Sequence, residues 1–204
     1  CKFVAFLPQW DFLNFLAEQG RRYPGFSLRT RAKAKRVIEE GGRIVGAVVD
    51  TDQGRIEVRS PLVVGADGRR SDIRASAGFA VKELGAPMDV LWFRLSRQAS
   101  DPVETMGRFD AGRIFIMINR GDNWQCGYVI PKGSLSRLQE AGLQAFRDGI
   151  VELAPYAADR VVEIASWDDV KLLTVGVDRL ERWHKPGVLC IGDAAHTMSP
   201  VGGV

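Results

Sequence analysis

The sequence contains few of the residues that bind metals or form disulfides. Its 204 residues include 2 histidines and 3 cysteines, and Cys1, Cys126 and Cys190 lie far apart. No two cysteines have the short spacing of a zinc site, and an odd number of thiols does not suggest a disulfide framework. We therefore expect no metal site, and the cysteine usage favours a cytoplasmic chain with reduced thiols.

Long apolar runs, targeting signals and basic patches are also scarce. No segment approaches the roughly 20 apolar residues of a membrane span, and the opening CKFVAFLPQW has no small-residue cleavage site. The one dense basic run, at 29–36, has no interleaved aromatic residues, so we interpret it as a solvated face. We expect neither a membrane span nor a nucleic-acid partner, and no Ser, His and Asp pattern suggests hydrolysis.

The chain does contain enough apolar material for a core. Hydrophobic residues make up 46% and charged residues 26%, which is typical of a globular protein. A helix is predicted over 8–19, because a proline opens it, apolar residues recur at helical spacing, and Gly20 follows. Short antiparallel strands joined by Gly-Gly and Asp-Gln-Gly turns are predicted over 36–61.

From about Gly78 the pattern changes to longer strands without intervening helices. We predict strands at 89–95, 103–109, 113–119 and 124–131, then a helix at 139–153 and a last strand at 170–175. Apolar strands flank this block on both sides, and each ends in a Gly and Asp pair. The order predicts an α/β fold in which a nucleotide-binding region is interrupted by a mainly antiparallel sheet.

The first flanking strand, 62–66, is predicted to end at a tight Asp67-Gly68 turn. Ser71 can cap the short helix that follows, and Arg74 lies three residues further on, where it can face the same side. An Asp held beside arginines can serve a pyrophosphate-containing cofactor. An ordinary strand, turn and capped helix with a salt bridge is the alternative.

The second flanking strand, 187–193, ends in Gly192-Asp193. Open α/β sheets bind ligands at the carboxyl ends of their strands, and a carboxylate there can accept hydrogen bonds from ribose or ribityl hydroxyls. The Pro-Val-Gly-Gly stretch at 200–203 would let backbone N–H groups approach a flat ring or an anion closely. The alternative is that these glycines only turn the chain.

The order GADGRRSDIR, a sheet segment and then RWHKPGVLCIGDAAHTMSPVGGV resembles the single-component flavin-dependent monooxygenases of the para-hydroxybenzoate hydroxylase type, also called group A. The resemblance implies a partial FAD/NAD(P)-binding Rossmann-like domain, with parts at 1–78 and 179–204, and an inserted substrate-binding sheet domain at 79–178. It also implies an enzyme that uses NADH or NADPH and O2 to oxygenate an aromatic or similar apolar small molecule.

The resemblance further implies cofactor contacts. Asp193 would bind the FAD ribose, and Asp67 with Arg74 would shape the site where FAD and the nicotinamide cofactor approach each other. Pro200, Gly202 and Gly203 would lie against the isoalloxazine ring. The full set of implied cofactor-binding residues is Asp193, Gly192, Pro200, Gly202, Gly203, Asp67, Gly68, Arg74 and Gln9. For Gln9, at the start of the first predicted helix, a solvated side chain is the alternative.

One departure from the family is large. The Gly-x-Gly-x-x-Gly segment that cradles the FAD pyrophosphate does not occur in these residues, and neither does the helix expected after Pro-Val-Gly-Gly. The chain therefore resembles an internal fragment, which we expect to be inactive by itself. The alternatives are a flavin-linked isoprenoid reductase, a flavin-dependent halogenase or a non-catalytic binding fragment. WQCGYVIP lacks the halogenase Trp-x-Trp-x-Ile-Pro motif, which disfavours the halogenase.

The inserted sheet is expected to supply the substrate pocket. Alternation places Gln125 and Gly127 on one face of their strand, and a glycine inside a strand often marks close approach by a ligand or another backbone. On the neighbouring strand, Met117 and Asn119 share a face and could line the same cavity; sheet packing is the alternative for all four. We expect Trp92 and Tyr128 to be core or interface aromatics. No catalytic residue is assigned, because nothing places His196 within reach of a substrate proton.

Overall fold

The computed structural model describes residues 7–110 and 112–199, which form two compact units. The first contains the described residues up to Phe79 together with Arg182–Ile191, and the second contains Ala80–Glu181 and the described residues from Gly192 onward. The domain boundaries expected from the sequence remain a prediction; by contacts alone, the segment from Gly192 groups with the second unit. Each unit is described by itself.

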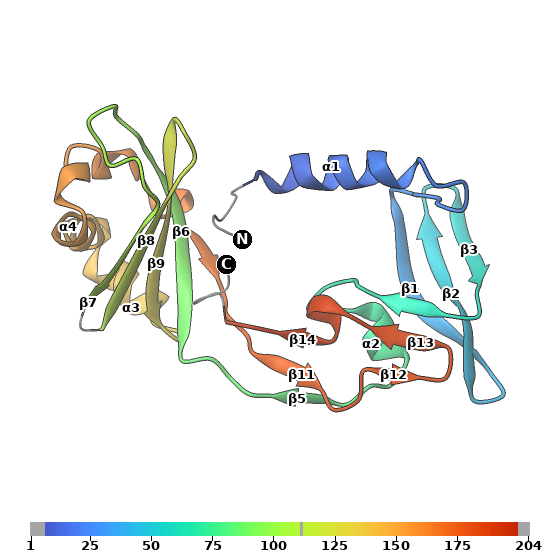
Figure 1. Ribbon diagram of the computed structural model, residues 1–204. Helices are drawn as coiled ribbons and strands as arrows, with labels where there is room; N and C mark the ends of the chain where they lie inside the picture. Colours follow the sequence, from blue (N-terminus) through green and yellow to red (C-terminus); the bar gives the residue numbers. More distant parts are fainter. Residues whose placement is uncertain (1–6, 111, 200–204) are drawn as a thin grey trace. The chain divides into compact units, whose positions relative to one another are not determined.

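The first unit contains the predicted helix and the predicted strand meander (Figure 1). Helix α1 (Gln9–Gly20) buries none of its residues. Strands β1 (Ala32–Glu40), β2 (Arg43–Thr51) and β3 (Gly54–Arg59) form an antiparallel sheet in the order β1-β2-β3. The glycines at the β1–β2 turn have positive φ angles of 57° and 78°, a conformation that glycine adopts without strain.

A second small sheet in this unit brings the two flanking strands together. Its order is β12 (His184–Lys185), β13 (Val188–Cys190) and β4 (Val63–Gly65), and β13 runs parallel to β4. Gly187, with φ of 80°, precedes β13, and a Cβ built there would lie 1.8 Å from the backbone oxygen of Ile44. Only glycine therefore allows this turn to sit against β2.

Both flanking strands are shorter than the sequence predicts, and β4 is not buried on both faces. The predicted strand at 187–193 ends at Cys190, and Gly192–Ala194 forms a 3-10 turn, η4. Leu62 and Val64 are 52% and 48% exposed. Helix α2 (Asp72–Ser76) has the predicted Ser71 cap and packs beside β1, where Val37 N donates to Ser76 Oγ.

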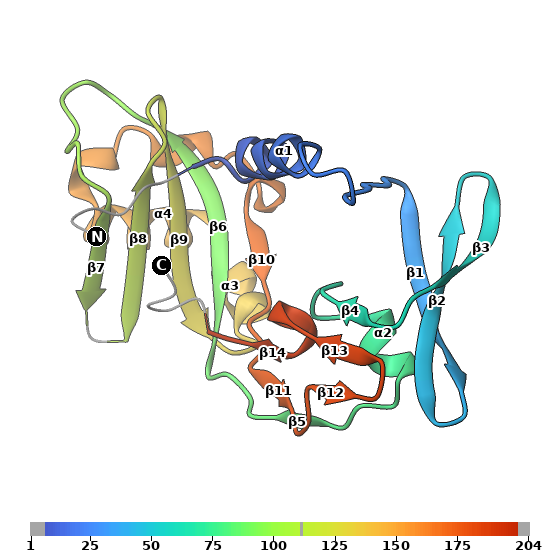
Figure 2. The same cartoon turned by 45° about the vertical axis from the view of Figure 1, so that its right-hand side comes forward.

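The second unit is built on a five-stranded antiparallel sheet in the order β10-β6-β9-β8-β7 (Figure 2). Its strands are β6 (Met88–Ser96), β7 (Met106–Asp110), β8 (Arg113–Asn119), β9 (Asn123–Pro131) and β10 (Lys171–Leu173). All five were predicted, although β7 starts later and β10 is shorter. From Leu91 to Ser96, buried residues of β6 alternate with more exposed ones, because successive side chains point to opposite faces.

Helices α3 (Leu135–Ala141) and α4 (Leu143–Leu153) cover one face of this sheet (Figure 1). The single helix predicted over 139–153 is wrong. Gly142 has a φ of 94°, which an α-helix cannot contain, so the chain breaks there and a new helix begins. The 3-10 turns η1 (Pro155–Ala157), η2 (Val161–Glu163) and η3 (Trp167–Asp169) continue the cover.

The covered face carries the main core of the unit. Phe146 of α4 packs edge-on against Phe93 of β6, with ring centroids 5.6 Å apart, and stacks on Trp167 at 5.4 Å. The fully buried side chains here include Leu91, Leu95, Phe115, Met117, Trp124, Cys126, Phe146, Ile150 and Ile164. Such burial stabilises the fold by about 1.5 to 3 kcal/mol for each large apolar side chain.

A buried ion pair lies at the edge of this core. Asp101 and Arg160 have side chains that are 3% and 4% exposed, and both guanidinium Nη groups donate to the Asp101 carboxylate. Trp124 Nε1 and Gln98 N also donate to Asp101, at 2.9 and 3.0 Å. Arg160 and these other donors lower the pKa of Asp101 from 3.8 to about 2, against the opposing effect of burial.

The second unit also contains a small antiparallel sheet in the order β14-β11-β5. Its strands are β5 (Val81–Glu83), β11 (Asp178–Leu180) and β14 (His196–Thr197). Near its junction with the large sheet, the buried Asp89 carboxylate accepts from Val175 N, Gly133 N and Lys132 Nζ. Among the described residues, no helix is long and apolar enough to cross a membrane.

Candidate functional site: two strand ends and an open sheet face

Strands β4 and β13 end side by side in the first unit. They are parallel, with Gly65 opposite Cys190, and Ile191 N donates to the carbonyl of Gly65. A Cβ on Gly65 would lie 2.9 Å from the Ile73 side chain and 3.3 Å from Cys190 Sγ, so glycine lets strand, helix and thiol pack closely. Cys190 is buried, and burial raises the pKa of its thiol, which fits a packing role.

The loop after β4 uses its aspartate to build its own structure. Asp67 accepts from the Ser71 hydroxyl with one carboxylate oxygen and from Ile73 N, at 3.1 Å, with the other. Ser71 Oγ in turn accepts from Arg74 N at 2.8 Å, and Arg74 Nη2 donates to the carbonyl of Arg69. The structure thus brings Asp67 and Arg74 together with the Ser71 cap, and Gly68, with a φ of 83°, makes the turn possible.

The aspartate after β13 is in the opposite situation. Gly192 has a φ of 55°, and the buried Ala194 and Ala195 that follow fix the turn, since Ala195 N donates to the Gly192 carbonyl. Asp193 is exposed, and no group among the described residues donates to its carboxylate. A fixed carboxylate without a local partner can accept hydrogen bonds from a ligand.

The remaining predicted cofactor contacts give less information. Pro200, Gly202 and Gly203 lie outside the described residues. Gln9 is the first residue of α1 and is exposed. These residues therefore remain predictions, as do the contacts predicted for the two strand ends.

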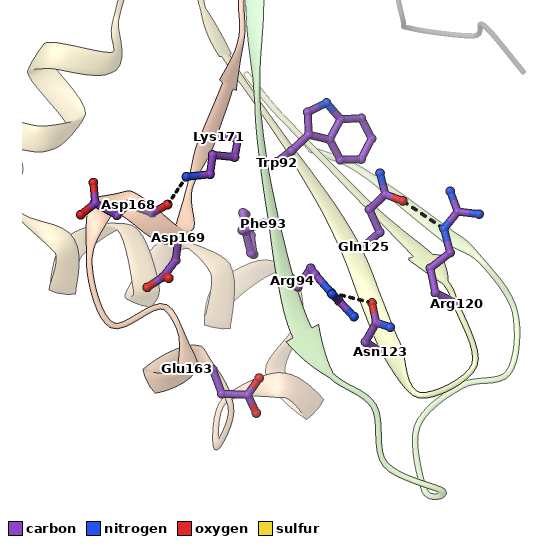
Figure 3. Close-up of a pocket in the computed structure, with 10 residues that line it drawn as sticks. All are labelled: Trp92, Phe93, Arg94, Arg120, Asn123, Gln125, Glu163, Asp168, Asp169 and Lys171. Atoms are coloured by element: carbon purple, nitrogen blue, oxygen red, sulfur yellow. Dashed lines mark hydrogen bonds between the residues drawn. The ribbon is translucent and has the colours of Figure 1, made fainter. Parts of the chain in front are cut away.

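A cavity of about 810 Å³ lies in the second unit, at the large sheet. It is lined by Trp92, Phe93, Arg94, Arg120, Asn123, Gln125, Glu163, Asp168, Asp169 and Lys171. Figure 3 shows Trp92, Arg94 and Gln125 on one side of β6, with the acidic residues on the other. We call the sheet surface that bears Trp92, Arg94, Ile116, Ile118, Gln125 and Gly127 the open face; it is the side of the sheet opposite the covered face.

The glycine in β9 makes room for an aromatic side chain of the same sheet. Gly127 pairs with Trp92, and a Cβ added to Gly127 would lie 3.2 Å from the indole ring. The sequence suggested close approach by a ligand or another backbone at Gly127, whereas the structure shows the half-buried Trp92 side chain beside it. Trp92 lies beside Gln125 in the cavity lining, whereas Tyr128 packs against the covered-face core, as expected.

Met117 and Asn119 do not share a cavity with Gln125, and this expectation is wrong. Met117 pairs with Cys126 and is 2% exposed on the covered face, where its sulfur accepts from the Tyr156 hydroxyl. Asn119 Nδ2 donates to the carbonyl of Val103, and its side-chain oxygen accepts from Gly121 N at 2.8 Å. Asn119 thus shapes the hairpin turn between β8 and β9.

Sequence reasoning missed Arg94 and Asn123 as lining residues. Arg94 Nε donates to Asn123 Oδ1 at 3.2 Å, and Arg120 Nε donates to Gln125 Oε1 at 3.0 Å (Figure 3). The signal that could have found Arg94 is the alternation of β6, which places it two residues from Trp92 on the same face. The register that brings it opposite Gln125 could not be read from one strand.

Comparison with known proteins gives related proteins for the whole chain. A family model described as an FAD binding domain matches residues 1–204. The 6-methylpretetramide 4-monooxygenase of Streptomyces rimosus is 35% identical over 198 residues, which cover 96% of this chain and 47% of that protein. Digeranylgeranylglycerophospholipid reductase 1 of Methanopyrus kandleri is 28% identical over 188 residues, covering 88% of this chain and 48% of the reductase.

Among solved structures, the myxobacterial chondrochloren halogenase CndH superimposes with a TM-score of 0.75 at 20% identity, over 94% of this chain and 46% of the halogenase. At this identity the likeness shows the fold alone. The chain spans about half the length of the curated relatives described above. The α/β fold with its antiparallel sheet agrees with these neighbours. Because the family model matches every residue of the sequence, the chain belongs to the FAD binding domain family.

Proposed function

We propose that the protein carrying this chain is an FAD-dependent monooxygenase that uses NADH or NADPH and O2 to hydroxylate an aromatic or similar apolar small molecule. The family match supports FAD as the cofactor. The 35% identity to a monooxygenase over nearly the whole chain supports the reaction class. The proposal concerns the whole protein, of which these residues supply two strand ends and a sheet face.

The observation that carries the proposal is the contrast between Asp67 and Asp193. Both carboxylates follow strands that end at one edge of a small parallel pair. Asp67 is occupied by its own loop, whereas Asp193 is exposed, and no described group donates to it. The residues present therefore fit a cofactor rich in hydroxyl groups, because Asp193 offers an acceptor that the fold itself does not use.

In this proposal, different residues would contact the ribose, the ring of the cofactor and the substrate. Asp193 would hold the ribose hydroxyls, and the loop built on Asp67, Gly68 and Arg74 would shape the surface beside the cofactor. Pro200, Gly202 and Gly203 would let the backbone lie close to its ring, with Gln9 as a polar contact. Bound FAD would supply electron transfer from NAD(P)H and the activation of O2. The open face would hold the substrate and exclude water from it.

The isoprenoid reductase remains the second candidate, because reductases of this kind are 28% identical over most of the chain. Oxygen consumption separates the two functions. A monooxygenase consumes O2 together with NAD(P)H when its substrate is present, whereas a reductase transfers electrons to its substrate without consuming O2.

The testing experiment is the visible absorption spectrum of the full-length natural protein, with and without the substitution Asp193→Ala. We expect oxidised-flavin bands in the natural protein. Loss of a charge-assisted hydrogen-bond acceptor would weaken FAD binding about ten- to a hundredfold in the variant, because such bonds contribute about 1.5 to 3 kcal/mol. Asp148→Ala serves as the matched control, since Asp148 is exposed on α4 and accepts from Gln144. A colourless protein that takes up no added FAD would rule out the monooxygenase and leave a non-catalytic binding protein.

A further inference from the structure

The C-terminal end of helix α2 is bound by a lysine from a distant part of the chain. Lys185 of β12 donates from Nζ to the carbonyl oxygens of Ala77 and Gly78, at 2.6 and 2.8 Å. The same ammonium group lies 4.9 Å from the centroid of the Phe79 ring. Carbonyls at the end of a helix have no partner within it, and no other described group donates to these two. Lys185 therefore satisfies the end of α2.

The opposite end of α2 builds the loop of Asp67. Ile73 N donates to the Asp67 carboxylate at 3.1 Å. Ala77 N, in turn, donates to the Ile73 carbonyl at 3.0 Å. The donor that fixes Asp67 and the carbonyls that bind Lys185 thus lie about one helical turn apart, and hydrogen bonds of the helix join them.

Helix α2 is too short to keep its position without contacts from outside. It has 5 residues, and isolated helices of fewer than about 12 residues are marginal in water. Lys33 of β1 pairs with Asp72 at the N-terminal end, but the Lys33 side chain is 68% exposed, and exposed pairs contribute little. Lys185 is half-buried and binds two carbonyls and a ring. We therefore expect the loss of Lys185 to release the C-terminal end of α2.

We propose that Lys185 is a positioning residue for the FAD site: by holding the C-terminal end of α2, it keeps the Ile73 amide aligned with Asp67 and so maintains the loop beside the cofactor. This inference rests on the proposed function and adds to it a residue that acts on cofactor binding through a helix. The charged donor is the important feature of the side chain. An arginine can donate to both carbonyls, whereas a methionine can donate to neither.

The first test is hydrogen–deuterium exchange of the full-length natural protein, freed of any bound flavin and measured by mass spectrometry. Lys185→Met should speed exchange in the peptide that contains Ile73 about tenfold, because loss of a charge-assisted hydrogen bond makes local opening easier. Exchange in peptides of β2 and β3 should stay unchanged. Lys185→Arg should restore the natural rate. Lys82→Met is the matched control and should change neither peptide, since Lys82 is exposed on β5 and no described group bonds to it.

The second test is the dissociation constant of FAD for the same proteins, obtained by titrating the flavin-free forms with FAD. Lys185→Met should weaken FAD binding about threefold, because the apparent affinity falls with the fraction of molecules whose loop is formed. Lys185→Arg should restore the natural affinity, and Lys82→Met should retain it.

Three results would overturn the positioning role. The first is an unchanged exchange rate at Ile73 in Lys185→Met. The second is equal acceleration in the β2 and β3 peptides, which would show a general loss of stability. The third is faster exchange at Ile73 with unchanged FAD affinity.

Two further provisions keep the proposals separate. Lys185→Gln, which loses the charge and keeps one donor group, replaces Lys185→Met if the methionine variant does not fold, and it should speed exchange at Ile73 in the same direction. A natural protein that takes up no FAD would refute the proposed function. The exchange rates would then still decide whether Lys185 holds the Asp67 loop.

Discussion

The two faces of the five-stranded sheet come from alternate residues of the same strands and yet have opposite characters. On β8, Phe115 is 2% exposed and packs in the core beneath α4, whereas the next residue, Ile116, is half-buried on the open face. On β6, the covered face receives Leu91 and Phe93, and the open face receives Trp92 and Arg94. One face is completed by the chain itself, and the other retains donors and an aromatic ring.

The comparison teaches where a ligand can contribute energy. On the covered face, the aromatic rings pack against one another and Arg160 donates to Asp101. These groups therefore offer a ligand no unused contact. On the open face, Arg94 is held only by a neutral amide among the described residues. Binding there can add bonds that folding has left unmade.

The largest expected effect comes from truncating neighbouring residues of β8. Phe115→Ala should lower the free energy of unfolding by about 3 to 5 kcal/mol, because it leaves a cavity in a closed core. Ile116→Ala should lower it by less than half as much, because the open face already exposes that side chain. Chemical denaturation of both variants gives the two values. An equal loss would mean that the open face is as well packed as the covered one, and the comparison would fail.

A smaller effect should appear at acid pH. The pKa of Asp101 falls from 3.8 to about 2 in the folded chain, chiefly because of Arg160, so the ionised form is favoured by folding. The resulting stability is fully present above pH 3.8 and is lost as the pH falls toward about 2. The loss should be on the order of 2 kcal/mol.

Unfolding free energies measured between pH 5 and pH 2 would test this, with Asp101→Asn as the reference. The asparagine side chain in this variant cannot ionise, so the unfolding free energy of the variant should vary less over the same pH interval. If the natural protein and the variant had parallel pH profiles, the ion pair would not be the source of the dependence. Asp159→Asn, which alters the exposed partner of Arg160, is the matched control and should retain the steep profile.

The smallest effects should differ in sign between the two faces. Gly149→Ala on α4 should stabilise the fold by about 0.5 to 1 kcal/mol, because alanine favours a helix and its Cβ would meet Tyr128 Oη at an ordinary 3.5 Å. Gly127→Ala should destabilise it by about 1 kcal/mol, because the added Cβ crowds the Trp92 ring. Thermal unfolding gives both signs.

Much of the fold could be predicted because local patterns determine it. The helix at α1, the antiparallel meander of β1 to β3 and the Ser71 cap of α2 all depend on residues close together in the chain. The helix break at Gly142 was missed, because apolar spacing continues through the glycine and only its positive φ interrupts the helix. The shortened β13 was missed because apolar composition alone does not show where strand pairing stops.

Only part of the candidate site could be predicted from the sequence. The Gly-Asp and Asp-Gly pairs are visible as residue patterns, and alternation correctly separated Gln125 from Cys126. The partner on β8 was chosen wrongly, because interstrand register is set by the hairpin turn that Asn119 shapes and by core packing. Met117 is placed on the covered face by that register, which no pattern within one strand contains.

The sequence by itself determined which residues can share a face, since side chains alternate along any strand, and it determined the two aspartates that follow apolar strands. Only the tertiary structure decided which face α3 and α4 would cover and which would keep Trp92 and Arg94 accessible. It also decided that both carboxylate oxygens of Asp67 accept hydrogen bonds from their own loop, whereas no described group donates to the Asp193 carboxylate. The physical reason is that burial and hydrogen-bond satisfaction depend on partners distant in the chain, which composition and spacing do not specify.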